Sequence, residues 1–121
     1  MSTIKTTTLS TQGGSTVPVD TVVNGTAKAW VNFDGTGTVA IRRAFNVSSI
    51  TDNGTGDYSV NFTVAMVDTS YSVCGTANML NTGDTGIASV YTLLTGSVRL
   101  LVGLRSVGSY DRQIISAAIF S

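Results

Sequence analysis

Apolar and polar side chains alternate along most of the chain from residue 27 onwards. From Tyr58 to Met66 every second side chain is apolar, while Ser59, Asn61 and Thr63 fall on the other face. A period of two is typical of a β-strand that buries one face. Further strands are indicated at residues 27–33, 39–47, 71–77, 87–94 and 98–104. Because we find no convincing helical period with caps, the pattern predicts about seven or eight short strands.

Glycine-rich turns separate these strands. Residues 34–37 form one such turn and residues 52–57 another, in which Asn53-Gly54 tolerates the positive φ that a tight hairpin requires. A break of phase at Ser48-Ser49 indicates a bulge or bend. Short strands joined by tight turns favour an all-β fold, and we expect residues 26–121 to form an antiparallel β-sandwich or small barrel, a jelly-roll-like knob.

The last predicted strand differs from the others because it is apolar on both faces. Its apolar side chains include Ile114, Ile115, Ala117, Ile119 and Phe120. A strand of this kind needs cover on both sides, and in a small one-domain protein a neighbouring subunit is the simplest source of that cover. We therefore predict a subunit interface at these five residues.

Residues 1–25 have a different composition from the rest of the chain. Thr, Ser and Gly are frequent, large apolar side chains are few, and the single proline, Pro18, lies here. Alone, such a segment buries too little surface to offset the entropy lost on ordering. It is either a flexible lead or an extended strand that becomes ordered by packing on other chains. We treat it as an extended N-terminal attachment segment.

Composition narrows the range of partners. Charged residues make up 12% of the chain, against about 25% in an ordinary soluble domain. Seven Lys and Arg residues balance seven aspartates, and there is no basic run beyond Arg42-Arg43, so nucleic acid is not an expected partner. Insertion into a membrane is not expected either, because no apolar stretch approaches the roughly 20 residues that a span requires. The neutral polar residues suit protein interfaces and sugar hydroxyls.

Candidate catalytic chemistry is sparse. The chain has no histidine and one cysteine, which removes Ser-His-Asp and Cys-His catalysis and the commonest metal ligand. We therefore expect a non-enzymatic protein without metal or other cofactor, and we expect Cys74 to be buried as a small apolar group. Asp52 and Asp57 bracket a hairpin, where a glycosidase pair or a calcium site is one interpretation. Aspartates that cap turns are the commoner case.

Arginine and aromatic residues give further expectations. Arg42 and Arg43 are neighbours on a strand and point to opposite faces, so one reaches solvent and the other needs a partner or an interface. The aromatic residues that could stack on sugars are Trp30, Tyr58, Tyr71, Tyr91 and Tyr110. Because Trp30 and Tyr58 lie within strong strand patterns, we expect these two to pack in the core. Tyr110, in a turn, is expected to be exposed.

Two runs carry a resemblance to a known family. Residues 24–38, NGTAKAWVNFDGTGT, and residues 45–58, FNVSSITDNGTGDY, resemble a module of bacteriophage tail-fibre proteins, especially those of marine and freshwater phages. In such proteins a variable stretch follows, and then an ending similar to residues 115–120 here. The opening, residues 1–6, also resembles the start of short phage fibre proteins, which implies a complete gene product. The match covers under half of the chain.

The resemblance implies a virion structural protein with a β-rich, trimeric C-terminal knob that recognises the host. On this basis we expect a homotrimer that contacts other virion proteins through residues 1–25 and binds a host-surface glycan or protein at the tail fibre. The alternative is a purely structural trimer, a capsid decoration or head fibre located on the capsid surface. A depolymerising enzyme is disfavoured because nothing resembles a catalytic set.

Loops are the expected place for a receptor site, because they vary without disturbing the core. Two loops, residues 78–86 and 108–112, fall in the stretch that departs from the shared module. Their amide, carboxylate, guanidinium and aromatic groups match sugar hydroxyls and sugar faces. The candidate receptor-binding residues are Asn78, Asn81, Asp84, Tyr110, Asp111 and Arg112. The alternative for each is that it only closes a turn through nearby backbone.

Overall fold

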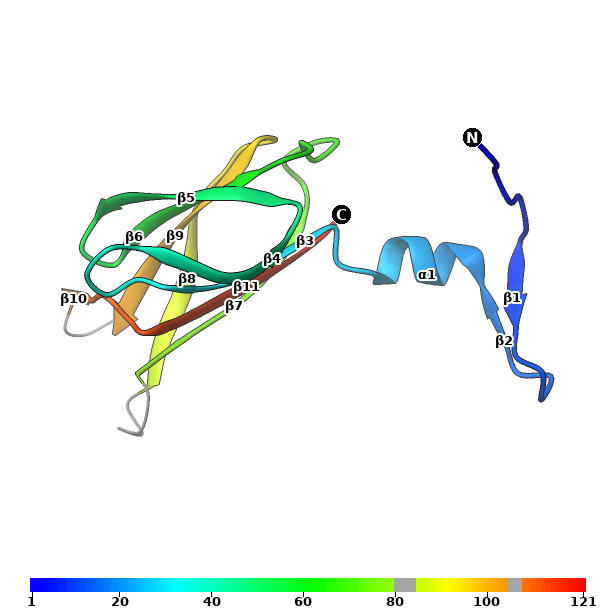
Figure 1. Cartoon of the computed structure of the whole chain (residues 1–121), viewed down its shortest axis with the longest axis horizontal. Helices are drawn as coiled ribbons and strands as arrows, with labels where there is room; N and C mark the ends of the chain where they lie inside the picture. Colours follow the sequence, from blue (N-terminus) through cyan, green and yellow to red (C-terminus); the bar gives the residue numbers. More distant parts are fainter. Residues whose placement is uncertain (80–84, 105–107) are drawn as a thin grey trace.

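The computed structural model describes residues 1–79, 85–104 and 108–121. Its main body is a nearly closed antiparallel β-barrel, or sandwich, with the strand order β4-β3-β11-β7-β8-β9-β6-β5. The strands wrap around a common interior, and the N-terminal segment lies apart from them (Figure 1). The predicted all-β antiparallel fold is therefore confirmed.

Four strands form one layer of the barrel and four form the other. The first layer contains β3 (Ala29–Asp34), β4 (Ala40–Phe45), β7 (Ser72–Asn78) and β11 (Ile114–Phe120). The second layer contains β5 (Val47–Gly54), β6 (Asp57–Phe62), β8 (Thr85–Leu93) and β9 (Ser97–Leu104), with the two-residue β10 (Gly108–Ser109) paired to β9. The last strand, β11, lies in the middle of the first layer because it pairs with both β3 and β7.

Alternation along the strands places the core between the two layers. Tyr58, Phe33, Leu100, Ile115 and Ile119 are the largest side chains that are fully buried there. The rings of Phe33 and Tyr58 meet edge to face, with centroids 5.3 Å apart, a favourable aromatic geometry. Burying each such side chain stabilises the fold by about 1.5–3 kcal/mol. The expected core position of Tyr58 is confirmed.

The subunit interface predicted on the last strand needs correction. Ile115, Ala117 and Ile119 are 0%, 3% and 0% exposed within the single chain. The second layer of the same barrel already covers them, so these three side chains offer no surface to another subunit. Ile114 and Phe120 point to the outer side of β11 and are half-buried.

The strand predicted at residues 39–47 is divided in two at Asn46. This residue has a φ of 53°, a left-handed conformation that asparagine tolerates better than most residues. Its side-chain amide donates to the carbonyls of Lys28 and Val64, both at 3.1 Å, and its Oδ1 accepts from the Val64 amide at 2.7 Å. The Asn46 side chain therefore connects the residue before β3 with the segment after β6. The predicted irregularity at Ser48 is present as a register shift between Val47 and Ser49.

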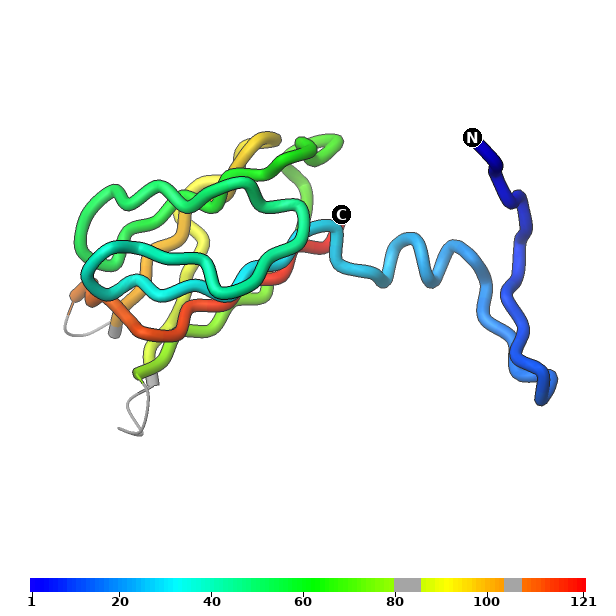
Figure 2. The backbone as a smooth tube through the Cα atoms, in the orientation of Figure 1, coloured from blue at the N-terminus to red at the C-terminus, as the bar shows by residue number. Residues whose placement is uncertain are grey.

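Residues 1–25 are not a simple extended segment. They form a hairpin of β1 (Thr8–Ser10) and β2 (Thr16–Pro18), followed by the helix α1 (Val19–Gly25). The chain leads away from the barrel through α1, and the hairpin lies at the far end (Figure 2). All of these residues are exposed except Val17 and Val19, which are half-buried. We call residues 1–25 the stalk.

The sequence pattern did not predict the helix of the stalk, because this helix is only 7 residues long. Its signals are nevertheless present: Asp20 lies in the first turn, and Val19, Val22 and Val23 share one face at the spacing i, i+3, i+4. No other helix is formed by the described residues, and α1 is far too short to cross a bilayer.

Candidate functional site

The first predicted receptor-binding loop is only partly within the structure. Asn81 and Asp84 lie outside the described residues. Asn78, the last residue of β7, is exposed, and its Oδ1 accepts a hydrogen bond from the amide of Met79 at 2.8 Å. This local contact matches the alternative in which the side chain closes a turn.

In the second predicted loop, Asp111 and Arg112 have internal positions. Asp111 Oδ1 accepts hydrogen bonds from the Gly56 amide at 2.8 Å and from the Tyr58 hydroxyl at 2.5 Å. Arg112 is only 6% exposed. Arg112 is therefore buried, and the half-buried Asp111 makes contacts within the barrel. Tyr110 is exposed as expected, and the Arg112 guanidinium carbon lies 5.4 Å from the centre of its ring.

The Tyr58 hydroxyl joins three segments at this end of the barrel. Besides Asp111, it lies 2.9 Å from the carbonyl of Gly35. Burial and then the hydrogen bond to Asp111 raise the pKa of Tyr58 far above its ordinary value, so the phenol stays protonated. A Cβ atom on Gly35 would lie 2.5 Å from the Tyr58 oxygen, so only glycine fits this approach.

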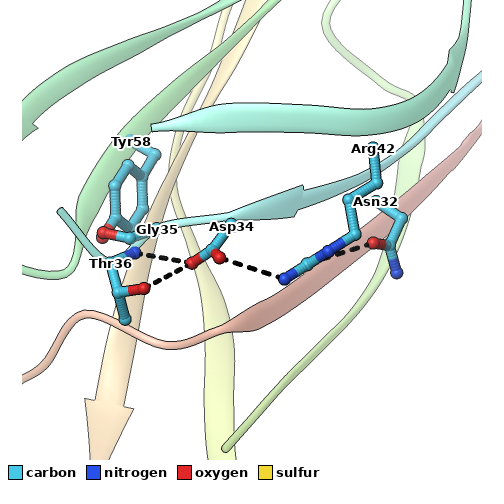
Figure 3. A network of polar contacts seen from close by, with 6 residues as sticks. All are labelled: Asn32, Asp34, Gly35, Thr36, Arg42 and Tyr58. Carbon is cyan, nitrogen blue, oxygen red and sulfur yellow. Dashed lines mark hydrogen bonds and ion pairs between the residues drawn. The ribbon is translucent and has the colours of Figure 1, made fainter. Parts of the chain in front are cut away.

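The neighbouring turn is fixed by Asp34. Its Oδ1 accepts hydrogen bonds from the amide and hydroxyl of Thr36 at 2.9 and 2.6 Å, and its Oδ2 pairs with Arg42 at 3.1 Å (Figure 3). The Thr36 hydrogen bonds, with the Arg42 charge, hold the pKa of Asp34 below its ordinary value. Arg42 thus has the expected partner, and both Arg42 and Arg43 are exposed. These contacts give Asp34 a structural role.

The outer side of the first layer carries an apolar row. Pairing of the strands places Phe45, Trp30, Ala118 and Cys74 side by side across β4, β3, β11 and β7. Phe45 is 55% exposed and Trp30 is 37% exposed, and Cys74 is also exposed. The expected burial of Trp30 and Cys74 was wrong, because the alternation of their strands turns them away from the core. We call these four residues the apolar row.

Polar side chains gather on part of the outer side of the second layer. At its centre Arg99 on β9 forms two parallel hydrogen bonds to Asp57 on β6, from Nε at 2.8 Å and from Nη2 at 2.6 Å. The Arg99 guanidinium carbon lies 5.0 Å from the centre of the Tyr91 ring. Asn53 donates to Ser59 Oγ at 2.9 Å and to Asp57 Oδ1 at 3.4 Å. We call Asn53, Asp57, Ser59, Tyr91 and Arg99 the polar cluster.

The ion pair makes the stability of the barrel depend on pH. Hydrogen bonding to Arg99, followed by its charge and the Asn53 amide, lowers the pKa of Asp57. A carboxyl whose pKa is lower in the folded state stabilises the fold above its unfolded pKa, and that contribution is lost as the pH falls through the folded value. We expect Asp57→Asn to lower Tm modestly at pH 7 and to have little effect well below pH 3.8, the ordinary value. Calorimetry of both proteins at the two pH values checks this, and an equal deficit at both would contradict it.

The remaining acidic candidate, Asp52, closes a turn. Its Oδ1 accepts a hydrogen bond from the Gly54 amide at 3.0 Å, whereas Asp57 faces Arg99. The two carboxyls therefore serve different contacts. Within the described ranges, no three His, Cys, Asp or Glu side chains gather as ligands for a metal ion. Comparisons with protein-family models, curated proteins and solved structures found no match to this chain.

Proposed function

We propose that this chain is a non-enzymatic structural protein of a bacteriophage virion, the trimeric knob of a tail fibre that attaches to a host-surface receptor. The observation that carries the proposal is a compact barrel on a protruding stalk whose apolar side chains are exposed. The likeness of residues 24–38 and 45–58 to tail-fibre proteins supports it, because these runs build the stalk junction, β3 and the β5–β6 hairpin. In this proposal the barrel is the knob of the fibre.

Two apolar surfaces support assembly with other copies. One is the apolar row, and the other is the stalk, where Val22 and Val23 are 40% and 52% exposed. The stalk enters the barrel at the start of β3, the strand that carries Trp30, so both surfaces adjoin the same end (Figure 1). Three copies around an axis along the stalk would cover both at once, and closed rotational symmetry is the common way in which identical chains do so. The apolar row thus replaces Ile115, Ala117 and Ile119 as the proposed interface.

The stalk is the proposed attachment to other virion proteins. It contributes nothing to the barrel core, since none of its residues is buried, and it is free to pack against another protein. The same arrangement also fits a head fibre or capsid decoration, which is the second candidate. Location on the particle separates the two.

Antibody labelling of intact phage particles tests this function. We expect gold-labelled antibodies against the barrel to decorate tail-fibre tips, and we expect purified protein to have the mass of a trimer in light scattering. Label on the capsid surface would select the structural alternative. Particles that carry no label would contradict both roles.

A further inference from the structure

Two β-bulges flank the ion pair of the polar cluster. On β5 the register against β6 shifts between Asp52 and Gly54, so Asn53 is an extra residue. On β8 the register against β9 shifts between Val90 and Thr92, so Tyr91 is an extra residue. A bulge redirects a side chain, and bulges are frequent beside functional sites. Here both redirected side chains contact the same Asp57–Arg99 pair.

The contacts leave the polar cluster accessible. Tyr91 is 62% exposed although it lies against Arg99. The side chains of Arg99 and Asp57 keep 39% and 18% of their surface exposed. A guanidinium has five N–H donors, and the pair with Asp57 uses two of them. The cluster therefore offers an aromatic surface beside oriented donors and acceptors.

The same face continues into a shallow hollow. Leu101 pairs with Asp57 on one side and with Ser89 on the other. A hollow of about 350 Å³ lies over Ile87, Ser89, Leu101, Gly103 and Ser109. A volume of a few hundred Å³ suits a small ligand. The hollow therefore adjoins the polar cluster, because Leu101, which lines it, is paired with Asp57.

We propose that this surface binds a neutral pyranose unit of a glycan. The apolar face of a pyranose ring packs on the Tyr91 ring, while its hydroxyls donate to the Asp57 carboxylate and accept from the Arg99 guanidinium. Because Asp57 neutralises Arg99, the site offers no unpaired positive charge to an acidic sugar or a phosphate. The site rests on the proposed attachment function and gives it a ligand class. It lies on the layer opposite the apolar row, so it stays exposed in the proposed trimer.

Binding of the purified trimer to an array of immobilised neutral and acidic glycans tests this site. We expect binding to glycans that end in glucose, galactose or mannose, and a loss of at least about tenfold in affinity for Tyr91→Ala and for Asp57→Asn, since each removes a contact of roughly 1.4 kcal/mol or more. Tyr91→Phe should bind as the natural protein does, because the ring remains. Thr51→Ala, on the same face but outside the cluster, is the matched control and should also bind normally.

Three results would overturn the site. The first is that the folded trimer binds no glycan, and the second is that it binds only acidic glycans. The third is that Tyr91→Ala leaves binding intact, or that Tyr110→Ala abolishes it instead. Circular dichroism of each variant ensures that only folded protein is compared. Failure here is distinct from failure of the proposed function, because fibre-tip labelling without glycan binding would leave the attachment role with a protein receptor.

Discussion

Ile115→Asp is expected to prevent the barrel from folding. The Ile115 side chain is fully buried between the layers, and its Cδ1 lies 2.8 Å from where a Cβ on Gly35 would be, so a carboxylate at this position would be buried as well. Loss of the buried side chain alone costs about 2–5 kcal/mol, and an unpaired buried charge adds more. The total loss is as large as most of the 5–15 kcal/mol by which a domain is typically stable. Circular dichroism and thermal unfolding measure the outcome.

Two controls define the Ile115 result. Ile115→Val should fold and lose only about 0.5–1.5 kcal/mol. Ala118→Asp, on the same strand but on its outer side, should also keep the folded barrel. A cooperative transition of Ile115→Asp near that of the natural protein would show that β11 is not packed as described.

Replacing both Trp30 and Phe45 with aspartate is expected to convert the proposed trimer into folded monomers. The two aromatic side chains are direct neighbours across β3 and β4, and large aromatic residues commonly contribute 2 kcal/mol or more each to an interface. The double variant should therefore weaken association by roughly a thousandfold. Light scattering at micromolar concentration measures the mass, and circular dichroism should report an unchanged barrel.

The matched control for this variant is Tyr91→Asp. Tyr91 is also an exposed aromatic residue but lies on the opposite layer, so this variant should remain a trimer. If the double variant stays trimeric, the copies meet through another surface. A natural protein that is monomeric would contradict the trimer itself.

Alternation could predict most strands and the core because it reports directly which side chains share a face. It also held the answer for Trp30, which falls out of phase with Ala29 and Val31, both buried. Its place within a strong strand pattern favoured the core, yet the period of two decides to which face of the strand a side chain points. For β11 the sequence shows that both faces are apolar. It does not show that the second layer of the same chain covers one of these faces.

The candidate site could not be predicted because it depends on strands that are distant in sequence. Arg99 and Asp57 meet only when β9 pairs with β6, and Asp111 meets Tyr58 across 53 positions. Asn53 was recognised as a turn residue, but its place in a bulge depends on the register of β5 against β6. No local pattern reports such a register.

The central position of β11 has a consequence for synthesis of the protein. Until residues 114–120 leave the ribosome, β3 and β7 have no strand between them, and both present unpaired backbone edges. The fold depends on pairing between segments over 80 residues apart, such as Asn32 and Ser116, which are separated by 84 positions. Contacts of this range form slowly. The barrel therefore cannot close while translation of its last strand is unfinished, and the unclosed intermediate is the species most prone to aggregation.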